Sequence, residues 1–405
     1  MRYRVYLKPF DDTGVYLDDF LDITDDVVNV SDVSQKIDSS EFDVGVIRNN
    51  GLTITLRNDG AKYSDPTNIK SIFKTKRKNS IIKITWAPYD EPPICGFAIC
   101  GSSVISDELT VFEGLLNEIT STTNIQKQQI TFSILGYESL LDEIETPYAD
   151  ISNGDFLSDT IYAMLNQSPF NSLVTVNLSN IVLSLDVTID DVSSLENTTV
   201  GDSIKNMLLA SNSVLYIKNN ILYVTAREES VDLKYTFYGQ GSTLGIENIL
   251  NIPKYKEGLN RTFNFWTWAN TTIVVKDVSS IDTYGVLQKQ IDLSLITDTT
   301  KRTNLLTVNK NEFRTPTPEL DLITPITVDT IALNILDKVN IDYPNVYTPS
   351  DNNPLPRYGQ VQYGSSRYPY GEFSLTIETE RNFKILGKKM NKRNNTITFS
   401  LREVL

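Results

Sequence analysis

The feature that most constrains this chain is a series of short segments in which apolar and polar residues alternate, separated by turn-forming residues. The clearest segment spans residues 51–57, where Leu52, Ile54 and Leu56 fall on one face of an extended strand. An Asn-Gly pair opens this segment and an Asp-Gly pair follows it, and both dipeptides favour hairpin turns. The same pattern continues at residues 81–86, 109–114 and 129–135. Many short strands with regular turns predict a β-barrel or β-sandwich for residues 1–146.

The spacing of the apolar residues changes after residue 153. In residues 155–166 they recur at the spacing of one helix face, and a second such set follows Thr199, which with Asp202 forms an approximate capping box. The two sets are Leu157, Ile161, Met164 and Leu165, and then Val200, Ile204, Met207 and Leu208. A hairpin is expected next, turning at Asn219-Asn220. Residues 147–234 are therefore predicted to form a small α+β domain inserted between β-rich parts.

A second β domain is predicted for residues 235–405. Its expected strands lie at residues 261–268, 273–276, 331–334, 373–377 and 396–401. Residues 343–371 are rich in tyrosine and proline, and because proline cannot donate to a strand ladder, this stretch is expected to be a long exposed loop. The predicted fold class is mainly β with a small α+β insertion.

Length and composition agree with a folded, β-rich chain. The 405 residues have room for about two to four domains, and 40% of them are hydrophobic. The amino-terminal residues lack the apolar stretch of a signal peptide, and no window approaches the length of a membrane span, so we expect folding in the cytoplasm. Cys95 and Cys100 have an odd separation that places them on opposite faces of a strand, which favours two buried thiols over a disulfide.

The ionisable residues exclude several classes of function. The formal net charge of −14 disfavours binding to nucleic acid, although DNA could slide through an acidic channel without sticking. The absence of histidine removes Ser-His-Asp and Cys-His nucleophile activation and the usual zinc sites. Acidic pairs such as Glu143 with Glu145 are expected by chance among 51 acidic residues, and Gly239–Gly245 is interpreted as a glycine-rich turn. We therefore predict no catalytic residues, no cofactor and no metal.

Two kinds of residue are candidates for binding a partner. The first kind is basic: Lys74, Lys76, Arg77 and Lys78, near Lys70, and then Lys388 and Lys389, near Lys392 and Arg393. These residues either form solvated surfaces or complement an acidic ring of a larger assembly. The second kind is aromatic: Tyr347, Tyr358, Tyr363, Tyr368 and Tyr370. These tyrosines suit a protein interface, which we favour, or the stacking of sugar rings.

Several short strings also carry a family resemblance. In the first part of the chain they lie at residues 22–25, 39–44, 51–60, 63–66, 95–99 and 130–137. Later strings lie at residues 280–285, 316–322 and 395–404. Together they resemble the hub proteins of phage tails and baseplates. The chain departs from that family at Leu336-Asp337, where the family usually has a glycine before the aspartate.

The resemblance implies an architecture and an assembly. It implies two similar β-barrels with an inserted domain, and a homotrimer that forms a pseudo-sixfold ring with a central channel through which DNA passes without specific binding. The ring would contact the tail tube and distal tail or baseplate proteins on one side and a spike or central fibre on the other. The implied location is the virion tail or the baseplate of an injection particle, assembled in the host cytoplasm. The alternatives are a hexameric distal tail adaptor with a carbohydrate-binding β domain, and a carbohydrate-active enzyme.

Overall fold

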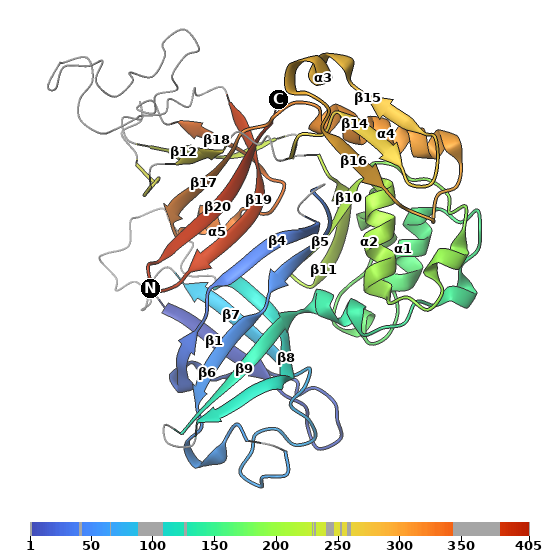
Figure 1. Cartoon of the computed structure of the whole chain (residues 1–405). Coiled ribbons are helices and arrows are strands. Elements are labelled where there is room, and N and C mark those ends of the chain that lie inside the picture. Colours follow the sequence, from blue (N-terminus) through green and yellow to red (C-terminus); the bar gives the residue numbers. More distant parts are fainter. Residues whose placement is uncertain are drawn as a thin grey trace, which may run out of the picture.

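Figure 1 shows the computed structural model of the chain. In the described residues it contains three β-sheets, with helices packed beside them. It describes residues 2–39, 43–64, 66–87, 108–124, 128–228, 230, 232–239, 247–251, 253–256, 261–342 and 381–404. The strand predicted at 373–377, the tyrosine- and proline-rich residues 343–371, Cys95 and Cys100 all lie outside these ranges, as do residues 240–246 of the glycine-rich turn.

The first sheet has seven strands, and every neighbouring pair is antiparallel. In spatial order the strands are β2 (Leu21–Asp22), β1 (Arg2–Lys8), β7 (Ile81–Ala87), β8 (Leu109–Asn124), β9 (Gln129–Gly136), β6 (Leu52–Arg57) and β3 (Val27–Val30). In β6, Leu52, Ile54 and Leu56 are buried, as their alternation predicts. The alternating segments that the sequence identifies at residues 51–57, 81–86, 109–114 and 129–135 therefore form the strands of one sheet.

The second sheet has ten strands, which come from segments far apart in the sequence. Its main path is β11 (Ile221–Ala226), β10 (Ser213–Lys218), β5 (Val44–Asn50), β4 (Val33–Ser39), β19 (Asn382–Asn391), β20 (Thr396–Val404), β17 (Glu319–Pro325) and β13 (Lys254–Lys256). Off this path, β12 (Leu233–Tyr238) pairs in parallel with β18 (Lys338–Asp342), which also pairs with β19. This sheet takes strands from all three segments that the sequence divides into domains.

The helices lie mainly in the inserted part and beside a small third sheet. The third sheet has the order β15 (Val274–Lys276), β14 (Phe265–Trp268) and β16 (Gln288–Ile291). The helices are α1 (Leu157–Leu165), α2 (Val200–Ser211), α3 (Val278–Tyr284), α4 (Thr299–Phe313) and α5 (Val328–Ala332). In Figure 1, α1 and α2 lie side by side next to the β10–β11 hairpin. None of the helices in the described ranges is long and apolar enough to cross a membrane.

Helix α2 illustrates how local sequence produces this packing. Thr199 accepts a hydrogen bond from the Asp202 backbone N–H at 3.2 Å, which satisfies one of the free donors at the start of the helix. The predicted apolar stripe is buried, and each such side chain contributes about 1.5–3 kcal/mol when it leaves water. The two helices and the hairpin expected in this segment are confirmed, with Asn219 and Asn220 both at positive φ in the turn.

Two hydrophobic cores meet at the second sheet. The first lies among the strands of the seven-stranded sheet and the carboxy-terminal strands, and the second lies among α1, α2, α4, the hairpin and the third sheet. Strand β5 contributes to both, because Ile47 packs in the first core while Val44 and Val46 pack in the second. This sheet therefore fixes the two halves of the chain against each other.

One predicted element is wrong. Residues 331–334 were expected to form a strand, but the structure ends α5 at Ala332 and continues into an irregular segment. Thr327 and Thr330 exchange hydrogen bonds between side chain and backbone and so start a helix there. The four-residue apolar pattern was too short to distinguish a strand from a helix end.

Candidate functional site

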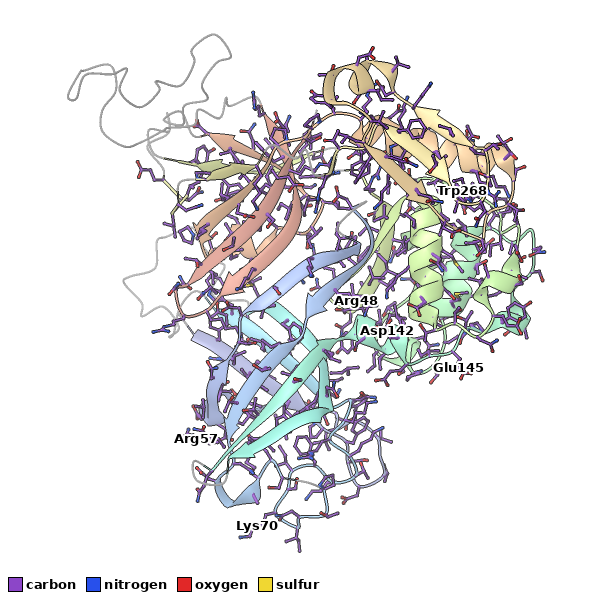
Figure 2. All side chains as sticks on the ribbon, viewed as in Figure 1. Arg48, Arg57, Lys70, Asp142, Glu145 and Trp268 are labelled. Carbon is purple, nitrogen blue, oxygen red and sulfur yellow. The ribbon has the colours of Figure 1, made fainter. Side chains whose placement is uncertain are left out.

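The basic loop, residues 69–78 between β6 and β7, is firmly attached to the first sheet. Phe73 and Tyr63 are fully buried, and the Phe73 ring meets the Phe132 ring edge-on with centroids 6.3 Å apart. Burial raises the pKa of Tyr63, whose hydroxyl donates to Asp26 at 2.5 Å. These buried aromatic side chains anchor the loop to the first sheet, and Figure 2 labels Lys70 in this loop.

The basic side chains of this loop face different environments. Lys70, Lys74 and Lys76 are exposed, and the Lys76 ammonium lies 4.1 Å from the Phe10 ring centroid. Lys78 pairs with Glu143 at 3.0 Å, and Arg77 is buried with its guanidinium 5.9 Å from the Phe132 ring centroid. The loop therefore presents three outward cations, next to an isoleucine, Ile69, that is 93% exposed.

The carboxy-terminal basic residues are not one surface patch. Lys388 is only 8% exposed, and its ammonium donates to the carbonyls of Ile331 and Leu333 at 2.5 and 2.9 Å. Burial lowers the pKa of Lys388 to about 7. Lys389 is exposed and pairs with Asp32 at 3.1 Å. The tyrosines proposed for partner binding, Tyr347, Tyr358, Tyr363, Tyr368 and Tyr370, lie outside the described residues.

A buried group of charged residues, called here the ionic junction, connects the start of β5 with α4, β19 and β20. It consists of Asp43, Arg227, Arg261, Glu312, Lys384 and Arg402. Asp43 pairs with Arg402 at 2.6 Å and with Arg261 at 3.0 Å, while Lys384 lies 3.7 Å from Asp43. Arg227 donates to Asn309 of α4 at 3.0 Å. Residues more than two hundred positions apart thus meet inside the protein.

The charges of the ionic junction determine its protonation. Burial alone would raise the pKa of Asp43, but Lys384, Arg402 and Arg261 outweigh that effect and hold the pKa below its usual range. Burial likewise opposes ionisation of Glu312, yet Lys384 and Arg227 lower its pKa to about 2. Both carboxylates are therefore ionised at neutral pH.

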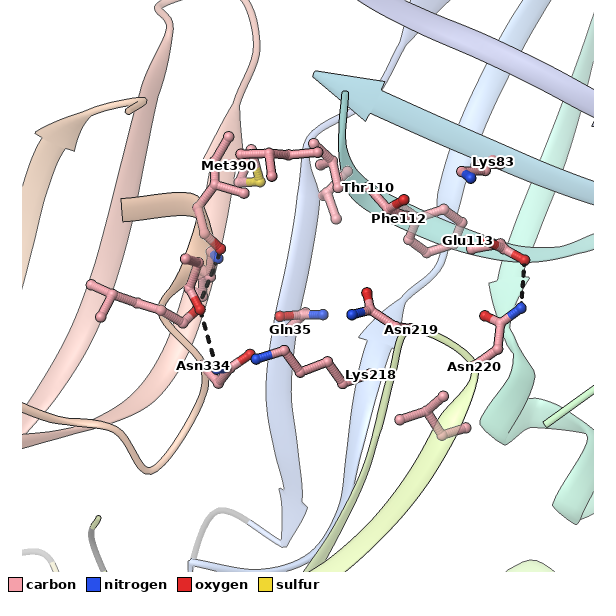
Figure 3. Close-up of a pocket in the computed structure, with 18 of the residues that line it drawn as sticks. Gln35, Lys83, Thr110, Phe112, Glu113, Lys218, Asn219, Asn220, Asn334 and Met390 are labelled. Carbon is pink, nitrogen blue, oxygen red and sulfur yellow. Dashed lines mark hydrogen bonds between the residues drawn. The ribbon is translucent and has the colours of Figure 1, made fainter. Parts of the chain in front are cut away.

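A cavity of about 540 Å³ lies beside β4 and β19, between β8, the tip of the β10–β11 hairpin and the end of α5. Figure 3 shows Gln35, Lys218, Asn219 and Asn334 extending into it from different elements. Asn220 at the hairpin turn donates to Glu113 at 3.0 Å, which fixes the turn against β8. Its lining combines amides, lysines and apolar side chains. Within the described residues, no group of three or more histidine, cysteine or acidic side chains is arranged to hold a metal.

Comparison with known proteins finds similar folds but no similar sequences. No protein-family model matches the sequence, and no curated protein matches it. Solved structures, however, match over almost the whole chain. A tail protein from Neisseria meningitidis matches with a TM-score of 0.56 at 10% identity, covering 100% of this chain and 96% of that one.

Two further structures agree. The 43 kDa tail protein of prophage MuSo2 from Shewanella oneidensis gives a TM-score of 0.52 at 11% identity, with 99% and 98% of the two chains covered. Prophage tail protein gp18 from Listeria monocytogenes gives 0.51 at 8% identity, with 98% and 94% covered. This chain has the fold of phage tail proteins. The mainly β fold class, and the resemblance to tail proteins as far as it concerns fold, are confirmed.

Sequence reasoning missed both the ionic junction and the cavity. Asp43 and Arg402 are 359 positions apart, and neither belongs to a motif. The single signal for the cavity was the Asn219-Asn220 turn, which identified the hairpin but not what its tip would face. Long-range strand pairing creates both features, and a local pattern does not encode it.

Proposed function

We propose that this chain is the structural hub of a phage tail or of a related injection baseplate, where it connects the tail tube to the tip or spike. The observation that carries the proposal is the fold likeness to three tail proteins, each covered over at least 94% of its length. In this proposal three copies form a closed ring, because a chain with two similar β domains offers six similar docking surfaces from three subunits. The division into domains at residues 1–146, 147–234 and 235–405 belongs to this proposal.

The proposed ring acts by binding and positioning its neighbours, without catalysis and without a cofactor. DNA passes through its channel without specific binding, which the net charge of −14 supports because like charges repel. The ring is assembled in the host cytoplasm and functions in the virion tail or the baseplate of an injection particle. The alternative is the distal tail adaptor. The number of subunits in the ring distinguishes the two, because the adaptor forms a ring of six.

The basic loop is the proposed docking surface toward an acidic neighbouring ring. Ile69 is 93% exposed and is followed by the exposed Lys70, Lys74 and Lys76. An exposed isoleucine in a loop with three exposed lysines suits an interface that combines apolar and charged contacts. Because Phe73 anchors the loop in the core, docking costs little ordering entropy. Lys78 and Lys389 already form ion pairs within the chain, with Glu143 and Asp32. We therefore assign them to the edges of the proposed contact surfaces.

The experiment that tests this proposal compares variants for incorporation into particles. Lysine-to-glutamate changes at 70, 74 and 76 together should leave the purified chain folded and strongly reduce its amount in purified tails, measured by quantitative mass spectrometry. Lys276→Glu, at an exposed position of β15, is the matched control and should be incorporated normally. Normal incorporation of the triple variant would refute the docking surface, and absence of the unmodified chain from purified tails would refute the tail role.

The tyrosine- and proline-rich stretch is proposed as a second assembly contact. Replacing residues 345–369 with a short Gly/Ser linker should reduce incorporation in the same assay, because four of the five candidate tyrosines, all but Tyr370, are lost. Normal incorporation with loss of attachment to cells would instead indicate sugar binding. Normal incorporation and normal attachment would remove these tyrosines from the account.

A further inference from the structure

The turn between β19 and β20, residues 392–395, packs on the first sheet. The Nζ atom of Lys392, the first residue of this turn, lies 5.0 Å from the centroid of the Tyr3 ring in β1. Tyr3 is directly opposite Trp86 of β7, and it packs against the first core. In Figure 1 the ends of β19 and β20 that this turn joins lie beside the start of β1. Lys392 is therefore a contact between the second sheet and the first.

The amine of Lys392 is buried without a hydrogen-bond acceptor. Within the described part of the chain, its Nζ atom and the Tyr3 hydroxyl oxygen are both buried, and neither has a hydrogen-bond partner. A protonated amine carries three N–H donors, and these lose their hydrogen bonds to water at this position. The face of the Tyr3 ring attracts a cation but replaces only part of that hydration. The neutral amine therefore suits this position better than the ammonium does.

The ionisable groups around Lys392 do not reverse this preference. The carboxylate of Asp32, just before β4, favours the ammonium, but it already pairs with the exposed Lys389 at 3.1 Å. Tyr3 of β1 carries no charge at neutral pH, because burial raises its pKa to about 12. Burial is therefore the dominant effect and lowers the pKa of Lys392 to about 7, against an ordinary value of 10.5. The amine changes its protonation near neutral pH.

Lys388 of the same hairpin provides a contrast. It is also buried, but its ammonium donates to the carbonyls of Ile331 and Leu333 at 2.5 and 2.9 Å. Lys388 lies within a strand, directly opposite Gln35 of β4, whereas Lys392 lies in a turn. Moving Lys392 into water therefore requires movement of the turn alone, while moving Lys388 into water requires separation of strands.

We propose that Lys392 is a pH-sensitive latch: its neutral amine holds the turn of residues 392–395 on β1, and protonation releases the turn. In the released turn the ammonium regains its hydrogen bonds to water. The far end of the turn stays attached, because the Ile326 N–H donates to the Asn395 carbonyl at 3.1 Å. Since an exposed lysine has a pKa of 10.5, the docked turn is most favoured above about pH 10.5. Its advantage falls by up to about tenfold per pH unit as pH decreases toward about 7. This inference does not depend on the hub role, because every contact lies within one chain.

Hydrogen–deuterium exchange of the purified full-length chain tests the latch. The readout is the protection of the amides in residues 390–397, which contain the turn and the last pairs of the β19–β20 ladder, normalised at each pH to the same peptide free in solution. In the unmodified chain, protection should rise by at least about tenfold from about pH 7 to about pH 9. Lys392→Met cannot be protonated, so its protection should be high at both pH values. Lys392→Arg stays charged, so its protection should be low at both.

The control is Lys276→Met, which replaces an exposed lysine of β15 and should respond to pH as the unmodified chain does. Equal protection of the unmodified chain at the two pH values would refute the latch. A rise in Lys392→Met as large as that in the unmodified chain would assign the pH dependence to another group, such as Lys388, and would also refute it.

Discussion

At the scale of single residues, Leu336 combines a strained backbone with a buried side chain, and these have opposite effects on stability. It has φ of +70°, a region that costs an L-residue with a Cβ about 1–2 kcal/mol, yet its side chain is only 6% exposed. This is the position where the resemblance to hub proteins implies glycine. Removing a buried leucine side chain costs about 2–5 kcal/mol, which exceeds the strain. The packing of Leu336 is therefore expected to outweigh its backbone strain.

Leu336→Gly is accordingly expected to lower the free energy of unfolding by about 1–3 kcal/mol, since relief of strain offsets only part of the lost burial. Urea denaturation measures this. Leu333→Gly is the matched control, because Leu333 is 5% exposed and has an ordinary φ of −65°, so its loss should be larger. If Leu336→Gly is as stable as the unmodified chain, strain outweighs packing at this position.

Asp43 is the residue on which the ionic junction depends. Asp43→Asn should lower the free energy of unfolding by about 3–5 kcal/mol, because it leaves the buried Arg402 guanidinium without its counter-charge. Asp202→Asn removes an exposed pair with Lys205 and should cost less than about 1 kcal/mol. Similar losses in the two variants would mean that the junction contributes no more than a surface pair.

The same junction predicts how stability depends on pH. The pKa of Asp43 is lowered in the folded chain and that of Glu312 is lowered to about 2, so both carboxylates bind protons more readily when the chain is unfolded. Their contribution is fully present above the unfolded carboxyl pKa of about 4 and is lost as pH falls toward about 2. The melting temperature should therefore fall below about pH 4, and less steeply in Asp43→Asn. Equal slopes in the unmodified chain and in Asp43→Asn would exclude Asp43 as a source of the pH dependence.

At the scale of single elements, local signals account for most of what the sequence predicted correctly. Helix α2 has an apolar stripe and an N-cap within a few residues, and β6 has its alternation and flanking turns. Helix α5 was missed because its capping uses two threonines, Thr327 and Thr330, where the usual pattern has a glutamate or glutamine at the second position. Elements whose ends depend on such individual hydrogen bonds are hard to recognise from composition.

The N-cap of α2 gives an element-scale prediction. Thr199→Ala should lower the free energy of unfolding by about 1 kcal/mol, since the Asp202 N–H loses its acceptor. Thr199→Ser keeps the hydroxyl and should remain within a few tenths of a kcal/mol of the unmodified chain. Thermal denaturation of both variants measures the difference, and equal losses would assign the effect to the methyl group of Thr199.

At the scale of the whole molecule, the sequence indicated the fold class but not the way the parts join. Pairing of β4 with β19 and of β10 with β5 connects segments that sequence patterns place in different domains. The ionic junction and the cavity both lie where those segments meet, so their residues could be recognised only after the pairing was known. The outward lysines of the basic loop and Lys389 are the residues of the proposed contact surfaces that sequence reasoning identified and that the structure describes as exposed.

The central claim is that this fold serves a ring-forming tail hub, and native mass spectrometry of the purified full-length chain tests it most directly. The account predicts a closed assembly of three times the 45.7 kDa chain mass, formed by the chain alone or on addition of its tail tube protein. A ring of six copies would contradict the hub assignment and favour the distal tail adaptor, and a chain that stays monomeric under both conditions would contradict the ring itself.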